Sequence, residues 1–197
     1  MELSQAQQER TTPVERGPSA LGYVRALPRN VQLAVAGGTG AAIVGSFVRF
    51  GLSGRAAVGA LFAAVLVLLS AIDLQRRLIP NVIVLPTLAI VLAAQIALFP
   101  DRTLEWVLAS LGAALFFFIP LFVYPAAMGM GDVKLAALLG VALGKSVVAA
   151  VLVGLFTAAA FALVILLREG LGSRKKAIAY GPFLAFGGLL VLFLGGR

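Results

Sequence analysis

The sequence predicts an all-α protein, a polytopic bundle of about seven transmembrane helices. Three observations lead to this prediction. Hydrophobic residues make up 61% of the 197 residues and charged residues only 12%, about half the charged fraction of a soluble domain. The mean hydropathy is +1.04. From residue 31 onward, apolar runs recur at lengths near the roughly 17–25 residues that a helix needs to cross a bilayer.

Residues 1–30 are polar and rich in Gln, Arg, Pro and Glu, so they are expected to form a disordered cytoplasmic tail. Gly, Pro or charged residues separate the apolar runs that follow, which span approximately 31–50, 56–73, 82–99, 104–124, 133–144, 146–167 and 178–195. The run 133–144 is too short for an ordinary crossing. It is either a tilted helix shielded by its neighbours or part of a broken unit with the next run.

Small residues in the first run suit close helix contact: Gly37, Gly38, Gly40, Ala41 and Gly45. A cytoplasmic N-terminus would place most of the 16 Lys and Arg residues on the cytoplasmic side, as the positive-inside rule requires. The net charge of +8 therefore needs no nucleic-acid partner, and none is expected. We expect a multi-pass protein of the plasma (inner) membrane that is surrounded by membrane lipid.

The chain contains no His and no Cys, which excludes several kinds of catalytic site. A Ser-His-Asp triad, a thiol nucleophile and a thiolate zinc site are all impossible, and we expect neither a metal nor a cofactor. Catalysis must use carboxylates, hydroxyls, Lys, Arg or the backbone. Six of the eight carboxylates are expected to be solvated surface charges: Glu2, Glu9, Glu15, Asp101, Glu105 and Glu169.

Asp73 and Asp132 differ because each adjoins an apolar run at the membrane boundary. A carboxylate near hydrocarbon is costly, so such a residue is a functional candidate by default. Two crossings separate them along the chain, which returns both to the cytoplasmic boundary. A pair of nearby carboxylates can share a proton and perform general acid–base catalysis. The structural alternatives are a helix N-cap for Asp132 and pairing with Arg76 or Arg77 for Asp73.

The glycines beside Asp132 have a mechanical interpretation. Gly129 and Gly131 carry no side chain and permit positive φ, so the backbone can turn tightly and approach an extended substrate. A proteolytic site in a membrane bundle needs such an opening for water and an unfolded peptide. Lys134 either biases the local field or marks the cytoplasmic side, and we favour the second interpretation.

Three segments resemble the type IV prepilin peptidases, a family of GxGD aspartic peptidases of the membrane. Residues 71–81 (AIDLQRRLIPN) are similar to the segment that carries the family's first catalytic aspartate. Residues 129–135 (GMGDVKL) resemble its GxGD-x-K segment, and residues 180–188 (YGPFLAFGG) resemble its C-terminal helix. GxGD alone is a weak pattern, but three ordered segments in a polytopic frame are specific.

The resemblance implies an enzyme that removes the short basic leader peptide of prepilins or pseudopilins at the cytoplasmic face. It implies that Asp73 and Asp132 are the catalytic pair. It also implies supporting roles for seven residues: Gly129, Gly131, Lys134, Pro80, Asn81, Gly181 and Pro182. The six-helix catalytic domain would occupy residues 56–197, with residues 31–55 as an additional N-terminal helix and loop.

The chain departs from the family in two respects. Many members carry an N-terminal cytoplasmic region with paired CxxC motifs that is associated with methylation of the new pilin N-terminus. This chain contains no Cys, which puts N-methyltransferase activity in doubt and indicates a minimal, peptidase-only form. Asn81 is neutral where relatives are often acidic, and we interpret it as the entry to a helix after Pro80.

Three other functions fit the sequence less well than the peptidase. An ion-coupled transporter could use both aspartates as a proton relay, but the runs 82–99 and 146–167 offer few polar residues. A non-catalytic scaffold or inactive relative is opposed by the intact pair of aspartates. A Ser–Lys hydrolase at Ser146 and Lys145 would lie on the outer side without an oxyanion arrangement.

Overall fold

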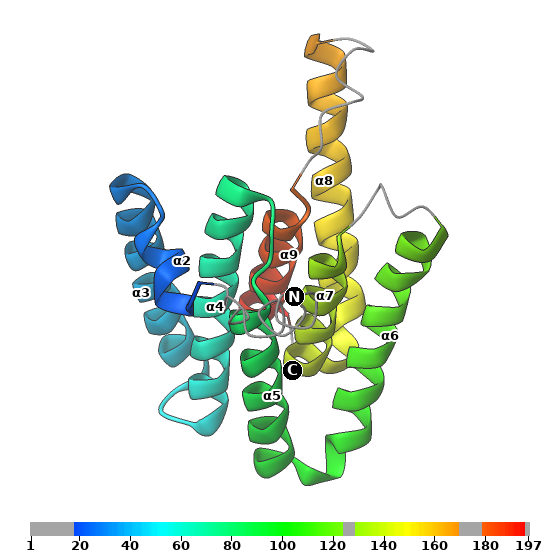
Figure 1. Cartoon of the computed structure of the whole chain (residues 1–197). Helices are drawn as coiled ribbons and strands as arrows, with labels where there is room; N and C mark the ends of the chain where they lie inside the picture. The colour runs from blue at the N-terminus through cyan, green and yellow to red at the C-terminus, as the bar shows by residue number, and fades with distance from the viewer. Residues whose placement is uncertain (1–17, 124–128, 170–178, 196–197) are drawn as a thin grey trace, which may run out of the picture.

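A computed structural model of the chain describes residues 18–123, 129–169 and 179–195, which are almost entirely helical (Figure 1). No strand occurs in these ranges. The helices are α2 (Ala20–Arg25), α3 (Arg29–Phe50), α4 (Gly54–Arg76), α5 (Asn81–Leu98), α6 (Thr103–Val123), α7 (Met130–Leu143), α8 (Val147–Glu169) and α9 (Gly181–Leu194), with 3-10 turns η1 (Pro100–Arg102) and η2 (Gly144–Ser146). The prediction of an all-α polytopic bundle is confirmed.

The helices α3 to α9 correspond to the seven predicted apolar runs. Five stretches are long and apolar enough to cross a membrane: Arg29–Phe50, Gly54–Arg76, Asn81–Leu98, Pro100–Phe122 and Met130–Arg168. The last stretch contains both α7 and α8, while α9 is a shorter apolar helix. The chain is therefore a multi-pass membrane protein.

The short run 133–144 forms a helix of its own. With 14 residues, α7 is about 21 Å long, less than the roughly 30 Å of a bilayer's hydrocarbon core. Gly144 ends it with a φ of 57°, in the left-handed region that glycine adopts without steric cost. A Cβ at Gly144 would also lie 2.7 Å from Trp106. The chain turns here and continues into α8, so α7 is a short helix that its neighbours enclose.

The prediction of a disordered tail is wrong for residues 18–30, which include α2 and the start of α3; residues 1–17 lie outside the described part of the chain. The hydroxyl of Ser19 accepts a hydrogen bond from the Gly22 N–H and caps α2. Leu27 is buried in the core and Tyr23 packs against it, while α3 already begins at Arg29. This short segment is held by tertiary contacts that apolar periodicity does not reveal.

Helices α4, α7 and α9 form the centre of the bundle (Figure 1). Their fully buried side chains make one core, which includes Phe62, Leu66, Leu69, Leu135, Leu138, Leu139 and Leu184. Close helix contacts occur at glycines, as is common in membranes. A Cβ at Gly140 would lie 2.5 Å from the carbonyl oxygen of Ala109 on α6, and a Cβ at Gly187 would collide with the carbonyl oxygen of Ala150 on α8.

The glycines of α3 behave as predicted only in part. A Cβ at Gly38 would lie 3.1 Å from Val67 of α4, and a Cβ at Gly45 would lie 3.3 Å from Phe193 of α9. Gly37 and Gly40, in contrast, have no atom within 4 Å of such a Cβ. The small residues of α3 therefore serve close packing on one side of the helix only.

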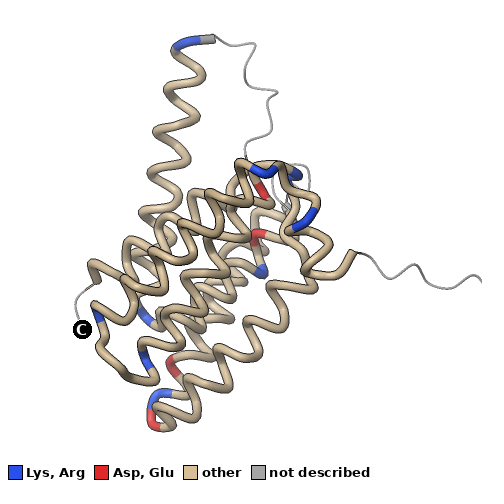
Figure 2. The backbone as a smooth tube through the Cα atoms, turned by 90° about the vertical axis from the view of Figure 1, so that its left-hand side faces the viewer, with Lys and Arg blue, Asp and Glu red and all other residues tan. Residues whose placement is uncertain are grey.

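Charged residues lie mainly toward the two ends of the bundle, with an apolar stretch between them (Figure 2). One end holds the C-terminus of α4 and the N-termini of α5, α7 and α9; we call it the aspartate end, because Asp73 and Asp132 belong to it. The opposite end holds the N-termini of α4 and α6 and the C-termini of α5, α7 and α9. We call it the arginine end, after Arg55 and Arg102.

Candidate active site

Asp73 lies in the last turns of α4 with only 5% of its surface exposed. Its Oδ2 accepts a hydrogen bond of 3.0 Å from the backbone N–H of Gly181, the first residue of α9. The N-terminus of a helix carries unpaired N–H groups and a partial positive charge. The side chain therefore has a fixed position, set by a residue 108 positions further along the chain.

Neither arginine suggested as a partner pairs with Asp73. Among the residues that the structure describes, the only ion pair joins Arg102 and Glu105. Arg76 donates to the carbonyl oxygen of Ala26 at 3.5 Å. Arg77 adopts left-handed backbone geometry with φ 51°, and its N–H donates to the carbonyl oxygen of Asp73. Helix α4 thus ends one turn after Asp73. The carboxylate of Asp73 is not used in an ion pair with either arginine and remains available for another role.

Gly181 and Pro182 both fit the beginning of α9. A Cβ at Gly181 would lie 2.6 Å from Asp73 Oδ2, so only glycine allows the helix end to approach the carboxylate this closely. Proline at the first turn of a helix sacrifices no intrahelical hydrogen bond, and Pro182 occupies that position. The positions of Gly181 and Pro182 at the start of α9 are therefore both explained by the structure.

Asp132 lies in the first turn of α7 and is partly buried. Its backbone N–H donates to the carbonyl oxygen of Gly129 at 3.1 Å. The N-cap residue of α7 is Gly129, without a side-chain capping bond, so the suggestion that Asp132 caps the helix is wrong. Helix α7 contacts α4, and Asp132 lies at the same end of the bundle as Asp73. Two segments that lie far apart in the sequence thus bring the pair of aspartates together.

Neither glycine of GMGD has a positive φ, and only Gly131 allows a close approach. Gly129 has a φ of −93°, and the positive-φ glycines of the described chain are Gly51 and Gly144. A Cβ at Gly131 would lie 2.9 Å from the Cβ of Ile79. The missing side chain at Gly131 lets α7 contact the extended segment that follows α4. Sequence reasoning missed Ile79, which is buried directly before Pro80.

Lys134 and Asn81 connect the two aspartate segments. The ammonium group of Lys134 donates a 2.7 Å hydrogen bond to Oδ1 of Asn81. Asn81 begins α5 directly after Pro80, whose carbonyl oxygen accepts from the N–H groups of Ile83 and Val84. Two of the supporting residues named from the sequence, Lys134 and Asn81, therefore meet in space. Lys134 has a specific partner here, beyond marking one side of the membrane.

We expect Lys134→Met to lower the leader cleavage that the sequence resemblance implies by about tenfold, with the protein still inserted. The change removes one charge-assisted hydrogen bond, worth about 1.5–3 kcal/mol, between the segments that hold the two aspartates. Asn81→Leu should have a similar effect, and the double variant should be no worse than either single one. Cleavage rates of the three variants at equal protein level check this, and additive losses would contradict the contact.

Within the described residues, no group of three or more Asp and Glu side chains is close enough to hold a metal ion. The site contains two carboxylates, one of which accepts a hydrogen bond from the backbone N–H of Gly181. At its edge the ammonium group of Lys134 lies 2.7 Å from the amide oxygen of Asn81. Fold and site together define a polytopic helical membrane protein with two carboxylates gathered near one end of the bundle.

Comparison with known proteins identifies the family. Residues 60–167, which include both aspartates, match the Type IV leader peptidase family, and the chain belongs to this family. It is 32% identical over 163 residues to proteins named prepilin leader peptidase/N-methyltransferase from two strains of Burkholderia pseudomallei, 1026b and K96243; the match covers 80% of this chain and 52% of theirs. A Bacillus subtilis protein of the same name is 30% identical over 156 residues, which cover 75% of this chain and 60% of that protein.

The chain thus spans about half the length of the Burkholderia relatives. No solved structure matches it significantly. The family assignment confirms the resemblance seen in residues 71–81 and 129–135. Gly181 and Pro182 lie beyond the matched residues, and their place in the site comes from the geometry around Asp73.

Proposed function

We propose that this chain is a membrane-embedded aspartic endopeptidase that removes the leader peptide from type IV prepilins or pseudopilins, with Asp73 and Asp132 as its catalytic residues. The observation that carries the proposal is that both carboxylates lie at the same end of an apolar bundle, on segments that contact each other through Gly131 and Ile79 and through Lys134 and Asn81. Membership of the Type IV leader peptidase family supports it, as do the names of the relatives.

The reaction needs only the groups that the pair supplies. One carboxylate, ionised, takes a proton from the attacking water; the other, protonated, donates to the carbonyl oxygen of the scissile peptide bond. The tetrahedral intermediate then breaks down: the proton taken from water goes to the leaving nitrogen, the hydroxyl formed from the carbonyl oxygen returns its proton to the second carboxylate, and the C–N bond breaks. The N–H of Gly181 fixes the position of Asp73 for this purpose. Lys134 and Asn81 hold the second segment in register with the first.

The proposed orientation places the aspartate end and the N-terminus on the cytoplasmic side. An excess of basic residues at one end of a membrane bundle favours the cytoplasmic side for that end. The basic residues that the structure describes at the aspartate end include Arg25, Arg29, Arg76, Arg77 and Arg168. Prepilin leaders are expected on the same side. Gln75→Cys and Asp101→Cys test this orientation with a thiol reagent that is added outside the cell and does not cross the membrane. Only the cysteine at position 101, in the η1 turn at the opposite end, should react.

A transporter is less consistent with the interior of the bundle. The buried polar side chains of the described chain, apart from Asp73, are Ser46, Thr87 and Gln95. Ser46 and Thr87 donate to carbonyl oxygens of their own helices, and Gln95 donates to Ala142 at the arginine end. These groups are individually satisfied and do not form a polar path between the two ends.

We expect the chain, co-expressed with a tagged prepilin in a host without its own prepilin peptidase, to shorten the prepilin by its leader. Gel shift and the mass of the new N-terminus measure this. The same mass tests methylation: we expect an unmodified N-terminus, because the chain lacks the cysteines associated with that step. An uncleaved prepilin beside correctly inserted protein would overturn the proposed activity, and a methyl-sized increment would overturn the peptidase-only form.

A further inference from the structure

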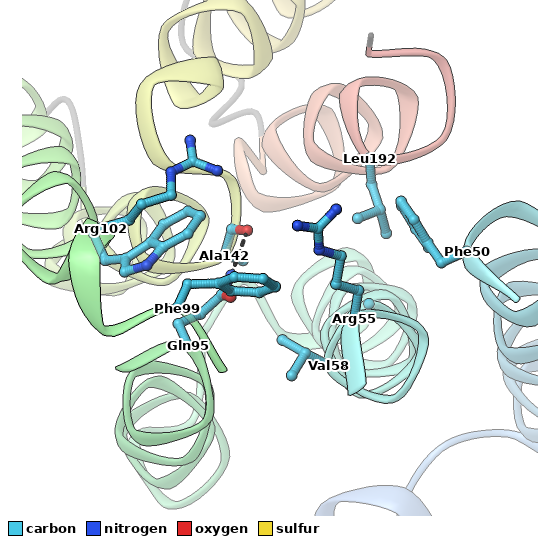
Figure 3. A pocket seen from close by; sticks show the side chains of 10 residues that line it. Phe50, Arg55, Val58, Gln95, Phe99, Arg102, Ala142 and Leu192 are labelled. Carbon is cyan, nitrogen blue, oxygen red and sulfur yellow. Dashed lines mark hydrogen bonds between the residues drawn. The ribbon is translucent and has the colours of Figure 1, made fainter. Parts of the chain in front are cut away.

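Gln95 is a buried polar side chain near the C-terminal end of α5, and it joins two helices. It is 6% exposed, and its amide nitrogen donates a hydrogen bond of 3.1 Å to the carbonyl oxygen of Ala142, in the last turn of α7. Figure 3 shows this bond as a dashed line at the arginine end. Asp132 lies at the opposite end of α7, in its first turn.

The other buried neutral polar side chains of the described chain bind within their own helices. Ser46 donates to the carbonyl oxygen four residues earlier in α3, and Thr87 does the same in α5. Such a bond forms within a single helix and does not depend on its neighbours. The bond of Gln95 is different, because it exists only while α5 and α7 keep one position relative to each other.

The contact has a local reason at the end of α7. The last four carbonyl groups of a helix lack their usual partners within that helix. The carbonyl of Gly140 accepts from the N–H of Gly144, whereas the carbonyl of Ala142 accepts from Gln95. An unpaired carbonyl is costly inside a membrane bundle. A neighbouring helix thus supplies a hydrogen bond that the end of α7 needs.

Helices α5 and α7 are therefore joined by a side-chain hydrogen bond near each end. Lys134 and Asn81 form the one at the aspartate end, and Gln95 and Ala142 form the one at the arginine end. Both helices begin at the aspartate end and pack against each other. A hydrogen bond is lost once its atoms are about 3.6 Å apart, whereas apolar contact is non-directional. The two bonds thus specify how far along α5 the helix α7 lies.

We propose that Gln95 is a positioning residue for Asp132. By binding the last turn of α7, it fixes α7 along α5 and so sets the place of Asp132 relative to Asp73. Because α7 is one unbroken helix of 14 residues, a shift of its last turn along the axis moves its first turn equally. A displacement of about 1 Å can lower a catalytic rate about 10²-fold. The kinetic consequences rest on the proposed function, whereas the helix position itself does not.

Gln95→Met keeps the length of the side chain and removes its donor. In the purified full chain with a prepilin substrate, we expect kcat to fall about tenfold, as for the loss of one hydrogen bond between membrane helices. KM should stay unchanged, because the change displaces Asp132 and removes no group that binds substrate. Thr87→Val is the matched control: it removes a buried hydrogen bond that lies wholly within α5, and kcat should stay unchanged.

A double variant separates positioning from a general loss of stability. Lys134 and Ala142 are eight residues apart on α7, about 12 Å along the axis, and at such separations independent effects on the rate usually multiply. If both bonds hold one helix position, either bond alone still favours that position. Gln95→Met combined with Lys134→Met should therefore lose more activity than the product of the two single losses.

The position of α7 can also be measured without activity, because the chain contains no Cys. Spin labels on Ala97→Cys, near the end of α5, and Met130→Cys, at the start of α7, report the distance along the two helices from exposed positions. We expect Gln95→Met to broaden the distribution of this distance and Thr87→Val to leave it unchanged.

Either of two results would overturn the proposal: a distance distribution in Gln95→Met as narrow as that of the wild type, or a double variant that loses no more than the product of the single losses. If the wild type cleaves no prepilin, the proposed function is wrong, and the label distances alone decide the role of Gln95. If Gln95→Met does not fold, Gln95→Asn replaces it, because its amide is one carbon too short for the 3.1 Å bond to Ala142.

Discussion

Asp73→Asn and Asp132→Asn are each expected to lower leader cleavage by at least about 10³-fold, within the range attributed to general acid–base catalysis. Asparagine has the size and shape of aspartate but can neither take nor give the proton that the reaction moves. In Asp73→Asn, the amide oxygen of the new side chain would still accept the Gly181 N–H that Asp73 Oδ2 accepts now. Insertion and Tm should therefore change little while cleavage is lost.

Asp101→Asn is the matched control for this pair. Asp101 is exposed in the η1 turn at the arginine end, and its substitution should leave cleavage unchanged. The double variant of Asp73 and Asp132 should be no slower than the single ones, because residues that act as a unit lose their shared contribution only once. Gel shift of a co-expressed prepilin measures all four proteins. Normal processing by either single variant would exclude the aspartic mechanism.

The helices could be predicted from hydropathy because most of the apolar runs are about as long as a bilayer crossing, and Gly, Pro or charged residues separate them. Asp73 and Asp132 could be selected as candidates for an energetic reason, since a carboxylate beside hydrocarbon is costly and is therefore a functional candidate by default. Both arguments depend on composition along the chain, and they need no knowledge of which helices touch.

The contacts that position the pair could not be predicted in the same way. The hydrogen bond between Gly181 and Asp73 spans 108 residues, and that between Lys134 and Asn81 spans 53. Hydropathy contains no information on such distances. The sequence alone suggests a tight turn with positive φ at the glycines of GMGD, yet Gly131 serves to bring α7 against Ile79. Whether a glycine serves a turn or a close contact depends on the element that packs against it. A single sequence does not identify that element.

Gly181→Ala is expected to lower cleavage by about 10²-fold, a loss typical of a catalytic group displaced by about 1 Å. The new Cβ would lie 2.6 Å from Asp73 Oδ2, closer than two such atoms can approach. Either the carboxylate turns away or the N-terminus of α9 moves. Both responses lengthen the hydrogen bond that fixes Asp73, so the catalytic geometry is lost whichever part gives way.

Two further glycines separate this effect from a loss of stability. Gly112→Ala, in α6, meets no atom within 4 Å and should leave cleavage unchanged. Gly187→Ala would place its Cβ against the Ala150 backbone on α8, so it should lower Tm and the amount of inserted protein. Cleavage per inserted molecule should persist in Gly187→Ala and fall in Gly181→Ala. If Gly181→Ala instead loses activity only in proportion to its protein level, the N–H of α9 supports the fold and has no part in positioning Asp73.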